Sequence, residues 1–437
     1  MVLRTKGRRV FALLANVCRI VLAVVLVVSG FVKAVDPMGT MYKLQEYVVS
    51  FGIDFLSDGW LLPIAIVHAA LEFLAGVFLF MGVYRKPMAV LVFFMFLFFT
   101  PFTLYVALND TVVGCGCFGD AIELTNWETF VKNLILLLFA TIVFVGRRRF
   151  VCNMSSRNRW MMVIFSVLYI SLVEGLSLNH LPVIDFRPYA IGNDLRAMVA
   201  GKDAAYDQIF FYGNDGEQRE LEPDGIADES WMMADAHVAL MGVRAGAVVE
   251  DFSILDWSND YDVSADILAD TGYVFVVAIE LLEEAEVSRV DMLNDLYDFC
   301  FENNVPFYAV TASGDEEIDL WRKRTGAEYP VYWADAMLLR TMVRANPGVV
   351  LFKDGVVVGK WNVSDVPDVE LFAKSPTGMP DKLVSLTGMM RGWYFWISVF
   401  FGPVLLMVLF DIVTGRSGKT GCRMSSGEGA SLPQVVE

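Results

Sequence analysis

Cys115-Gly116-Cys117-Phe118-Gly119 lies between two long apolar stretches, Met88–Leu108 and Phe130–Val145. A helix needs roughly 20 apolar residues to cross a bilayer, and residues 125–129 can extend the second stretch to that length. The two cysteines therefore belong to a short loop at a membrane surface, beside a bundle of helices. Two cysteines one residue apart in such a loop are a candidate thiol–disulfide centre.

The composition of the rest of the chain agrees with a membrane protein. The 437 residues are 56% hydrophobic, which is too apolar for an ordinary soluble enzyme. The first apolar stretch is too long for a signal peptide, and no small-residue cleavage site follows it before Lys33. The candidate spans are Phe11–Val32, Trp60–Val83, Met88–Leu108, Phe130–Val145, Trp160–Leu178 and Trp393–Val413.

Basic residues gather in alternate connections between these spans. The connection 109–127 has no Lys or Arg, and 34–59 has Lys43 alone, whereas the others are basic: 1–9, 84–87, 147–159 and 415–437. Positively charged loops stay in the cytoplasm. The pattern predicts six spans in a bacterial inner membrane with both termini cytoplasmic. It also predicts that the cysteine loop and residues 179–391 are periplasmic.

The large segment 179–391 is acidic, with 38 Asp and Glu against 16 Lys and Arg. Such a domain does not bind nucleic acid, because phosphate groups repel it. Its charge fits a solvated domain at a membrane surface. Recruitment of a basic partner is the alternative.

Ionisable side chains lie within or at the ends of the first two spans: Arg19, Lys33, His68 and Glu72. An ionised group in hydrocarbon costs at least ~2.5–3.5 kcal/mol, so such groups pair inside a bundle. We expect Glu72 to pair with Arg19 or Lys33. The pair would either fix helix register or form a proton or quinone site. His68, one turn before Glu72, is expected to bond locally, and no residues show metal-ligand spacing.

Residues 10–146 resemble the DoxX/MauE family of four-helix membrane proteins. The motifs that carry the resemblance are Ser29-Gly30-Phe31-Val32-Lys33 with Asp36-Pro37, Glu72 followed by Gly76 and Gly82, Gly114 to Asp120, and Asn126-Trp127 with Lys132-Asn133. The resemblance implies thiol redox or disulfide maturation of exported proteins. The bundle is also similar to vitamin-K-epoxide-reductase-like proteins.

Cys115 and Cys117 are the candidate catalytic residues. A thiolate attacks a disulfide, and a neighbouring thiol resolves the mixed disulfide. A disulfide between Cys115 and Cys117 closes a small ring, and Gly116 supplies the backbone freedom that this ring needs. A strained disulfide is oxidising, and a quinone is the candidate electron acceptor. A structural disulfide, or two thiols that cap a turn, are the alternatives, since redox pairs usually have two intervening residues.

Strand and helix patterns alternate in the acidic segment, which predicts a small α/β sheet. The helix at 283–303 should bury Val287, Val290, Leu293, Leu296 and Tyr297 on one face. The other predicted elements are a hairpin at 208–212 and 217–221, strands at 252–256, 273–279, 306–311, 346–352 and 356–361, and a helix at 315–325.

This order resembles the thioredoxin fold of membrane-tethered TlpA-like proteins. Asn346-Pro347 matches the family's cis-proline, and Tyr329-Pro330 precedes a strand as in the approach to its active-site face. The resemblance implies a client-binding surface formed by Tyr329, Pro330, Asn346 and Pro347.

The acidic segment departs from that family at the cysteine pair. The pair should follow the strand at 273–279, but residues 280–284 read Glu-Leu-Leu-Glu-Glu. Cys300 comes later, on a helix, and is expected in the core, where cysteine behaves as a small hydrophobe. The domain therefore has no dithiol chemistry of its own, and degenerate modules of this kind more often bind than catalyse.

The sequence thus predicts a multi-span α-helical membrane bundle plus an α/β thioredoxin-like ectodomain. The leading function is a thiol-redox or disulfide-maturation factor whose partners are the lipid bilayer and an envelope or periplasmic protein client. The alternative is a non-enzymatic scaffold or accessory subunit of an envelope complex. The predicted organisation is a four-helix domain at 1–150, a fifth span at 155–178, a hairpin-containing extension at 179–241, the thioredoxin-like domain at 242–370, a linker at 371–391, a sixth span at 392–414 and a disordered cytoplasmic tail at 415–437.

Overall fold

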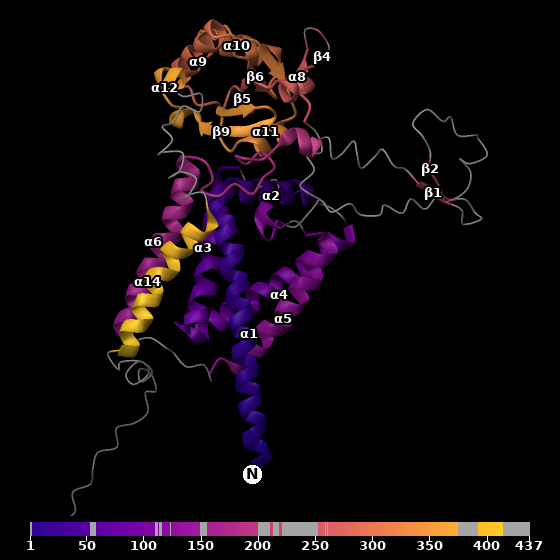
Figure 1. Ribbon diagram of the computed structural model, residues 1–437. Coiled ribbons are helices and arrows are strands. Elements are labelled where there is room, and N and C mark those ends of the chain that lie inside the picture. Colours follow the sequence, from indigo (N-terminus) through magenta and orange to yellow (C-terminus); the bar gives the residue numbers. More distant parts are fainter. Residues whose placement is uncertain are drawn as a thin grey trace, which may run out of the picture. The chain divides into compact units, whose positions relative to one another are not determined.

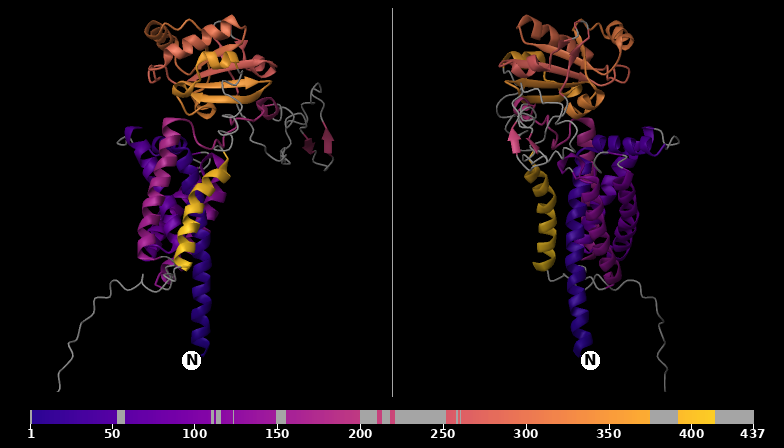
Figure 2. Two further views of the ribbon diagram at one scale, coloured as in Figure 1. Left: turned by 60° about the vertical axis from the view of Figure 1, so that its left-hand side comes forward. Right: turned by 90° about the vertical axis from the view of Figure 1, so that its right-hand side faces the viewer.

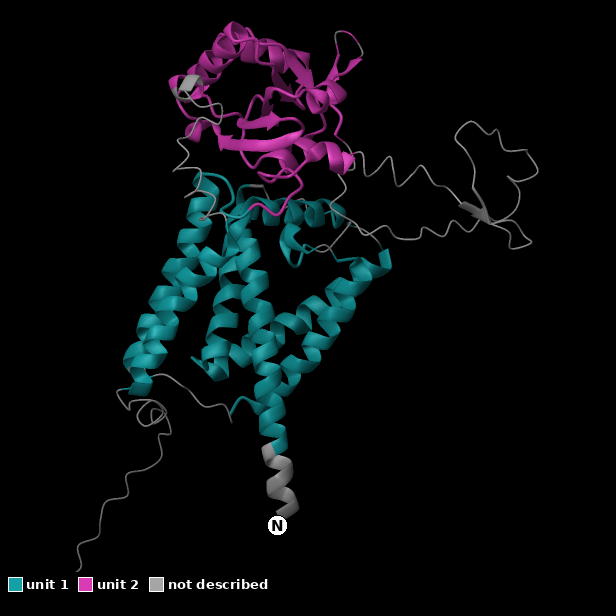
Figure 3. Cartoon of the chain, viewed as in Figure 1, with its two compact units in different colours: residues 1–184, 387–437 teal, residues 185–386 magenta. Residues whose placement is uncertain are grey.

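The chain forms two compact units in the computed structural model, residues 1–184 with 387–437 and residues 185–386 (Figure 3). The second unit is thus an insertion in the first. The structure describes residues 2–52, 58–109, 112, 116–122, 124–148, 155–199, 210–212, 218–220, 252–257, 259, 261–374 and 392–413.

The first unit is helical (Figure 1). Its elements are α1 (Val2–Val35), α2 (Pro37–Ser50), α3 (Asp58–Met81), α4 (Arg85–Asn109), the 3₁₀ turn η1 (Gly119–Ala121), α5 (Asn126–Gly146), α6 (Ser156–Asn179) and α14 (Trp393–Val413). Among the described residues, six segments are long and apolar enough to cross a membrane: Val10–Val35, Gly59–Met81, Arg85–Asn109, Asn126–Gly146, Arg157–Asn179 and Trp393–Val413. The six predicted spans are confirmed as helices, with ends that differ by a few residues.

Helices α1 and α3 pack closely because glycines remove side chains between them. A Cβ at Gly30 would collide with the backbone of Phe73, and one at Gly76 would collide with the backbone of Val27. Small residues allow this close approach of membrane helices, where dispersion contacts rather than water drive association.

Helices α6 and α14 lie side by side in the same unit (Figure 1). The Tyr169 hydroxyl donates to the Trp396 carbonyl at 2.9 Å. At the other end of the pair, the Ser155 backbone N–H donates to the Asp411 carboxylate at 2.8 Å. Interhelical hydrogen bonds of this kind give polar groups the partners that the hydrocarbon of a bilayer cannot provide.

Helix α2 was not predicted, because residues 34–59 read as a connection between two spans. The helix begins after Asp36, whose side chain accepts a hydrogen bond from the Gly39 N–H at 2.9 Å. Pro37 occupies its first position, where the missing N–H costs nothing. The short, half-polar segment gives no hydropathy signal, although its caps are typical of a helix start.

The second unit contains a mixed sheet, seven-stranded in its described part, with strand order β4-β3-β7-β6-β5-β8-β9. β5 pairs parallel with β6 and antiparallel with β8, and β6 pairs parallel with β7. The elements are β3 (Leu255–Asp256), β4 (Tyr261–Asp262), α8 (Ser264–Ala269), β5 (Tyr273–Ile279), α9 (Val290–Glu302), β6 (Phe307–Thr311), α10 (Asp315–Thr325), β7 (Val331–Trp333), α11 (Ala336–Met342), β8 (Gly348–Lys353), β9 (Val356–Asn362), η3 (Val363–Asp365) and α12 (Val369–Lys374). The predicted α/β class is confirmed, and the sheet is consistent with a thioredoxin-like domain.

Helices cover both faces of this sheet (Figure 2). Helices α9, α10 and α12 contribute to one apolar cluster with alternate residues of β5. Cys300 is fully buried in that cluster, as predicted, and burial raises the pKa of its thiol to about 12. The buried residues of α8 and α11 lie outside this cluster, and α11 contacts β5 and β6 from the opposite face.

Residues 185–199 contact β9, where the Gly192 N–H donates to the Val357 carbonyl at 2.8 Å. The Lys360 ammonium on β9 lies 2.6 Å from the Asp185 carboxylate, and the Arg187 guanidinium lies 2.8 Å from it. Burial by itself would raise the pKa of Asp185, but the charges of Lys360 and Arg187 outweigh burial and lower it to about 2.

Two predicted elements need correction or qualification. The helix predicted at 283–303 is α9, which begins at Val290 rather than at residue 283, and Val287 is 48% exposed in the turn before it. The short hairpin is confirmed as β1 (Phe210–Tyr212) paired antiparallel with β2 (Gln218–Glu220). Its turn, most of the 371–391 linker and the 415–437 tail lie outside the described residues.

Candidate functional site

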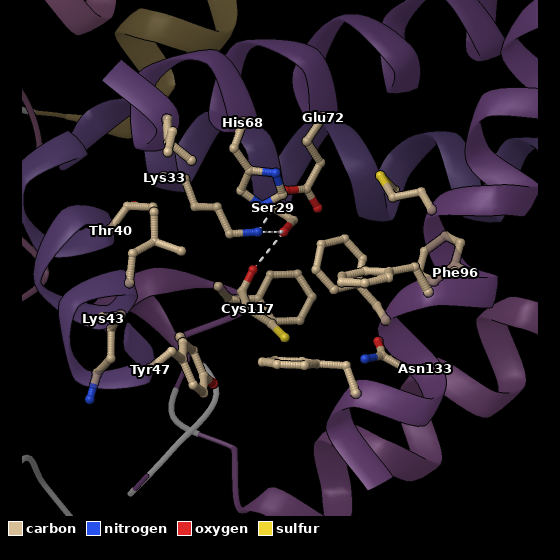
Figure 4. Close-up of a pocket in the computed structure, with 18 of the residues that line it drawn as sticks. Ser29, Lys33, Thr40, Lys43, Tyr47, His68, Glu72, Phe96, Cys117 and Asn133 are labelled. Atoms are coloured by element: carbon tan, nitrogen blue, oxygen red, sulfur yellow. Dashed lines mark hydrogen bonds and ion pairs between the residues drawn. The ribbon is translucent and has the colours of Figure 1, made fainter. Parts of the chain in front are cut away.

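A cavity of about 320 Å³ lies within the helical unit, bounded by α1, α2, α3, α4, α5 and the cysteine loop (Figure 4). Half of its apolar lining residues are aromatic: Tyr47, Phe51, Phe96, Phe98, Phe99, Phe102 and Phe118. Its polar lining is Ser29, Lys33, Thr40, Lys43, His68, Glu72, Cys117, Lys132 and Asn133. A few polar groups in an otherwise apolar hollow of this size are typical of a small-molecule site.

The Lys33–Glu72 ion pair lies in this cavity. Lys33 Nζ is 2.6 Å from a Glu72 carboxylate oxygen, and the two side chains are 9% and 10% exposed. The His68 Nε2 atom is 3.8 Å from the same oxygen, one turn away on α3. The predicted pairing of Glu72 is therefore with Lys33.

Arg19 lies elsewhere on α1. It precedes Lys33 by 14 residues (33 − 19), which is about 21 Å along a helix. Its guanidinium donates to the Leu79 carbonyl at 3.3 Å, two turns beyond Glu72 on α3. Lys33, His68 and Glu72 are thus brought together, and Arg19 is not part of that group.

A chain of hydrogen bonds links the ion pair to the cysteine loop. Lys33 Nζ donates to Ser29 Oγ at 3.0 Å, and Ser29 Oγ donates to the Cys117 carbonyl at 2.6 Å. The sulfur of Cys117 points into the cavity among the aromatic rings (Figure 4). Cys115 lies outside the described residues.

Gly116 has φ = +62°, a left-handed conformation that glycine adopts at no steric cost. A Cβ there would also lie 3.1 Å from the Lys43 side-chain stem. Lys43 on α2 therefore covers the loop between the two cysteine positions, and its ammonium binds Glu46 at 2.9 Å and points away from the cavity (Figure 4). Glycine at 116 serves both the turn and this contact.

Sequence reasoning assigned no site role to five polar residues that the fold brings to the cavity: Ser29, Thr40, Lys43, Lys132 and Asn133. Ser29 could have been found, because it precedes Lys33 by one helical turn. Lys132 and Asn133 come from α5, and nothing local indicates that α5 faces α1 and α2. Asn133 Nδ2 donates to the Thr103 hydroxyl at 3.3 Å, which joins α5 to α4. Among the described residues, no cluster of three or more His, Cys, Asp or Glu could hold a metal ion.

The predicted client-binding residues of the second unit have different environments. Tyr329 is 1% exposed, in the core, and its hydroxyl accepts from Trp321 Nε1 at 3.1 Å. Pro347 is buried after a cis peptide bond with Asn346, as the resemblance implied. Of the four, Pro330 is exposed and Asn346 is partly exposed. Tyr329 therefore does not present its side chain to a client.

Polar contacts occupy the end of β5, where the resemblance would put a cysteine pair. Glu280 lies 2.6 Å from the Arg340 guanidinium. Asn346 Nδ2 donates to the Leu281 carbonyl at 2.9 Å, and the Asn346 carbonyl accepts from the Glu286 N–H at 2.9 Å. These bonds fix the segment after β5 against the proline loop.

The fold and the cavity define a multi-span helical membrane protein with an inserted α/β domain. Residues 11–146 match the family described as methylamine utilisation protein MauE. This match covers α2 to α5, the cysteine loop and α1 from residue 11 onward. No curated protein and no solved structure matches the chain. The DoxX part of the resemblance and the thioredoxin-like assignment stay predictions from motifs and strand order.

Proposed function

We propose that this protein is a membrane thiol-redox factor that matures disulfides in envelope proteins through Cys115 and Cys117. The observation that carries the proposal is that the Cys117 sulfur points into the aromatic cavity that holds the Lys33–Glu72 pair. A cysteine with only a structural role has no need of a ligand-sized hollow at its sulfur.

The reaction is a disulfide exchange followed by reoxidation. A client thiolate attacks the Cys115 sulfur of a Cys115–Cys117 disulfide, and the Cys117 thiolate leaves. A second client thiolate then attacks the mixed disulfide, which releases an oxidised client and leaves two reduced cysteines in the loop. Because Cys117 faces the cavity, we assign reoxidation to Cys117 and client contact to Cys115.

The cavity residues fit a quinone as the electron acceptor. Its aromatic wall can stack on a planar ring, and Lys33 and His68 can donate hydrogen bonds to a ring carbonyl. A quinone would supply the acceptor for two electrons and two protons as the two thiols close to a disulfide. Glu72, at 2.6 Å, keeps the Lys33 ammonium in place on the wall.

The proposed location is a bacterial inner membrane, with both termini cytoplasmic and the cysteine loop and α/β domain periplasmic. The distribution of Lys and Arg supports this orientation. External labelling of intact spheroplasts with a membrane-impermeant maleimide should reach the reduced cysteine loop and not Cys422, which lies outside the described residues. Labelling of Cys422 in that experiment would contradict the orientation.

Within this scheme the α/β domain holds the client and does no redox chemistry. The Glu280–Arg340 ion pair at the end of β5 and the buried Cys300 support a binding role. The same observations favour the second candidate function, a scaffold or accessory subunit that binds an envelope partner without thiol chemistry.

Thiol trapping in membranes separates the two functions. In Cys117→Ala, the Cys115 thiolate should attack an oxidised client and accumulate as a mixed disulfide, because Cys117 is no longer present to displace the client by closing the loop disulfide. Cys18→Ala is the matched control, since Cys18 is a buried cysteine of the same bundle. The loop cysteines of the unaltered protein should become reduced when quinones are depleted. Partner co-purification that survives loss of both loop cysteines, with no mixed disulfide in any variant, would favour the scaffold.

A further inference from the structure

Lys132 is a partly buried cation at the cavity that no described carboxylate neutralises. Its ammonium lies over the ring of Phe118, 4.6 Å from the ring centroid. No ion pair of Lys132 is found within the part of the chain that the structure describes. A lysine at the edge of hydrocarbon normally pairs with an anion, and a ring face replaces only part of that interaction.

The other charged groups around the cysteine loop are largely paired or distant. Lys33 on α1 is paired with Glu72 on α3, and Lys43 on α2 with Glu46. α4 contributes only apolar residues to the cavity wall. The titratable side chains that line the cavity are Lys33, Lys43, Tyr47, His68, Glu72, Cys117 and Lys132, with Glu46 paired to Lys43 and Asp120 exposed in the loop. Lys132 is thus the lining cation that no described carboxylate pairs with.

The position of that charge relates it to Cys117. Phe118 follows Cys117 directly, so their Cα atoms are about 3.8 Å apart. Lys132 and Cys117 line the same cavity. A nearby cation in surroundings of low polarity favours a thiolate over a thiol, and the thiolate is the reactive form.

We propose that Lys132 is a positioning residue that stabilises the Cys117 thiolate, with the Phe118 ring holding its ammonium beside the loop. The inference rests on the proposed function, which gives the thiolate its use as leaving group and electron donor. It adds a specific role for an α5 lysine. It also accounts for a cation that has no structural partner among the described residues.

The test measures thiol acidity in the full-length protein, without any client. In a Cys115→Ala background, reduced Cys117 is alkylated with iodoacetamide between pH 6 and 10, and its modification is followed by peptide mass spectrometry. Because loss of a cation near a thiol in a medium of intermediate polarity shifts the thiol pKa by roughly one unit, Lys132→Gln should raise the midpoint of the pH–rate profile by about 0.5–1.5 pH units. At pH 7 this corresponds to about 3- to 30-fold slower alkylation.

Matched variants separate charge from packing. Lys132→Arg keeps the cation and should stay within about twofold of the parent rate. Lys86→Gln removes an exposed lysine at the start of α4 and should change nothing. Phe118→Leu keeps the lysine but removes its ring, and should slow alkylation at least threefold at pH 7. If Lys132→Gln does not fold, the Phe118→Leu result decides.

A Lys132→Gln profile that coincides with the Lys86→Gln profile would overturn the inference. The outcome is independent of redox cycling. A shifted profile in a protein whose cysteines never cycle would refute the proposed function alone, whereas cycling cysteines with an unshifted profile would refute only the role of Lys132.

Discussion

The Lys33–Glu72 pair offers the sharpest test of how the helical unit is held together. Glu72→Leu removes the carboxylate and leaves the Lys33 ammonium 9% exposed in an apolar bundle. Breaking a buried ion pair by removing one partner costs about 3–5 kcal/mol. Since domains are stable by only about 5–15 kcal/mol, we expect a clear loss of folded protein.

The double variant Lys33→Met/Glu72→Leu should behave differently. Both charges are gone, so no charge remains to be desolvated, and the expected effect runs from neutral to about 1–4 kcal/mol of added stability. The Lys43–Glu46 pair on α2 is the control, because its side chains are 33% and 31% exposed. Glu46→Leu should cost less than about 1 kcal/mol.

The assay is the folded fraction of the full-length protein in detergent, followed by circular dichroism during titration with a denaturing detergent, with all four proteins in parallel. The reasoning is refuted if Glu72→Leu costs no more than Glu46→Leu. It is equally refuted if the double variant is as unstable as Glu72→Leu, because uncompensated charge would then not be the cause. A Glu72→Leu protein that folds normally but loses thiol cycling would make the pair a working site rather than a structural one.

Three further results are expected. Burial raises the pKa of Cys300 to about 12, so Cys300 should resist alkylation at pH 8 until the protein is unfolded. Peptide mass spectrometry can check this, and labelling of Cys300 in the native protein would contradict its core position. The pKa of Asp185 is lowered to about 2, so its ion pairs should stabilise the α/β domain above about pH 4. The unfolding free energy of the domain should fall by roughly 2 kcal/mol between pH 4 and pH 2. Asp185→Asn should remove this part of the pH dependence. Glu174 on α6 is 4% exposed, and its Oε1 has no hydrogen-bond partner among the described residues. Glu174→Leu should therefore raise the unfolding free energy by about 1–3 kcal/mol. A lower thermal stability of this variant would contradict the prediction.

The spans could be predicted from the sequence because hydropathy over about 20 residues is a local signal that no tertiary contact overrides. α2 was missed because it is short and half polar, and so gives no such hydropathy signal. Its residues Thr40, Lys43, Leu44, Tyr47 and Val48 line the cavity at helical spacing, but that spacing indicates a buried face only once the neighbouring helices are placed.

The site was predictable only where its geometry is local. His68 and Glu72 are one turn apart on one helix, so their proximity follows from helix geometry. The choice between Arg19 and Lys33 required the offset of α1 against α3, which glycines at their crossing determine. The approach of Lys132 to Phe118 depends on how α5 packs, and no pattern in either segment encodes it. In the second unit, Val287 fits the helical spacing, yet the bonds from Asn346 hold the segment before it out of the helix.

The pairing of α6 with α14 also sets an order of events during synthesis. The partners Ser155 and Asp411 are separated by 256 residues, and the whole inserted unit, residues 185–386, is made between them. A contact of such long sequence separation forms late, after the intervening chain has been made. Until α14 arrives, α6 enters the bilayer without its neighbour, and the Tyr169 hydroxyl lacks the Trp396 carbonyl. The α6–α14 pair is therefore completed only when α14 has been made, and a chain that stops before residue 393 would leave Tyr169 and Ser155 without these partners.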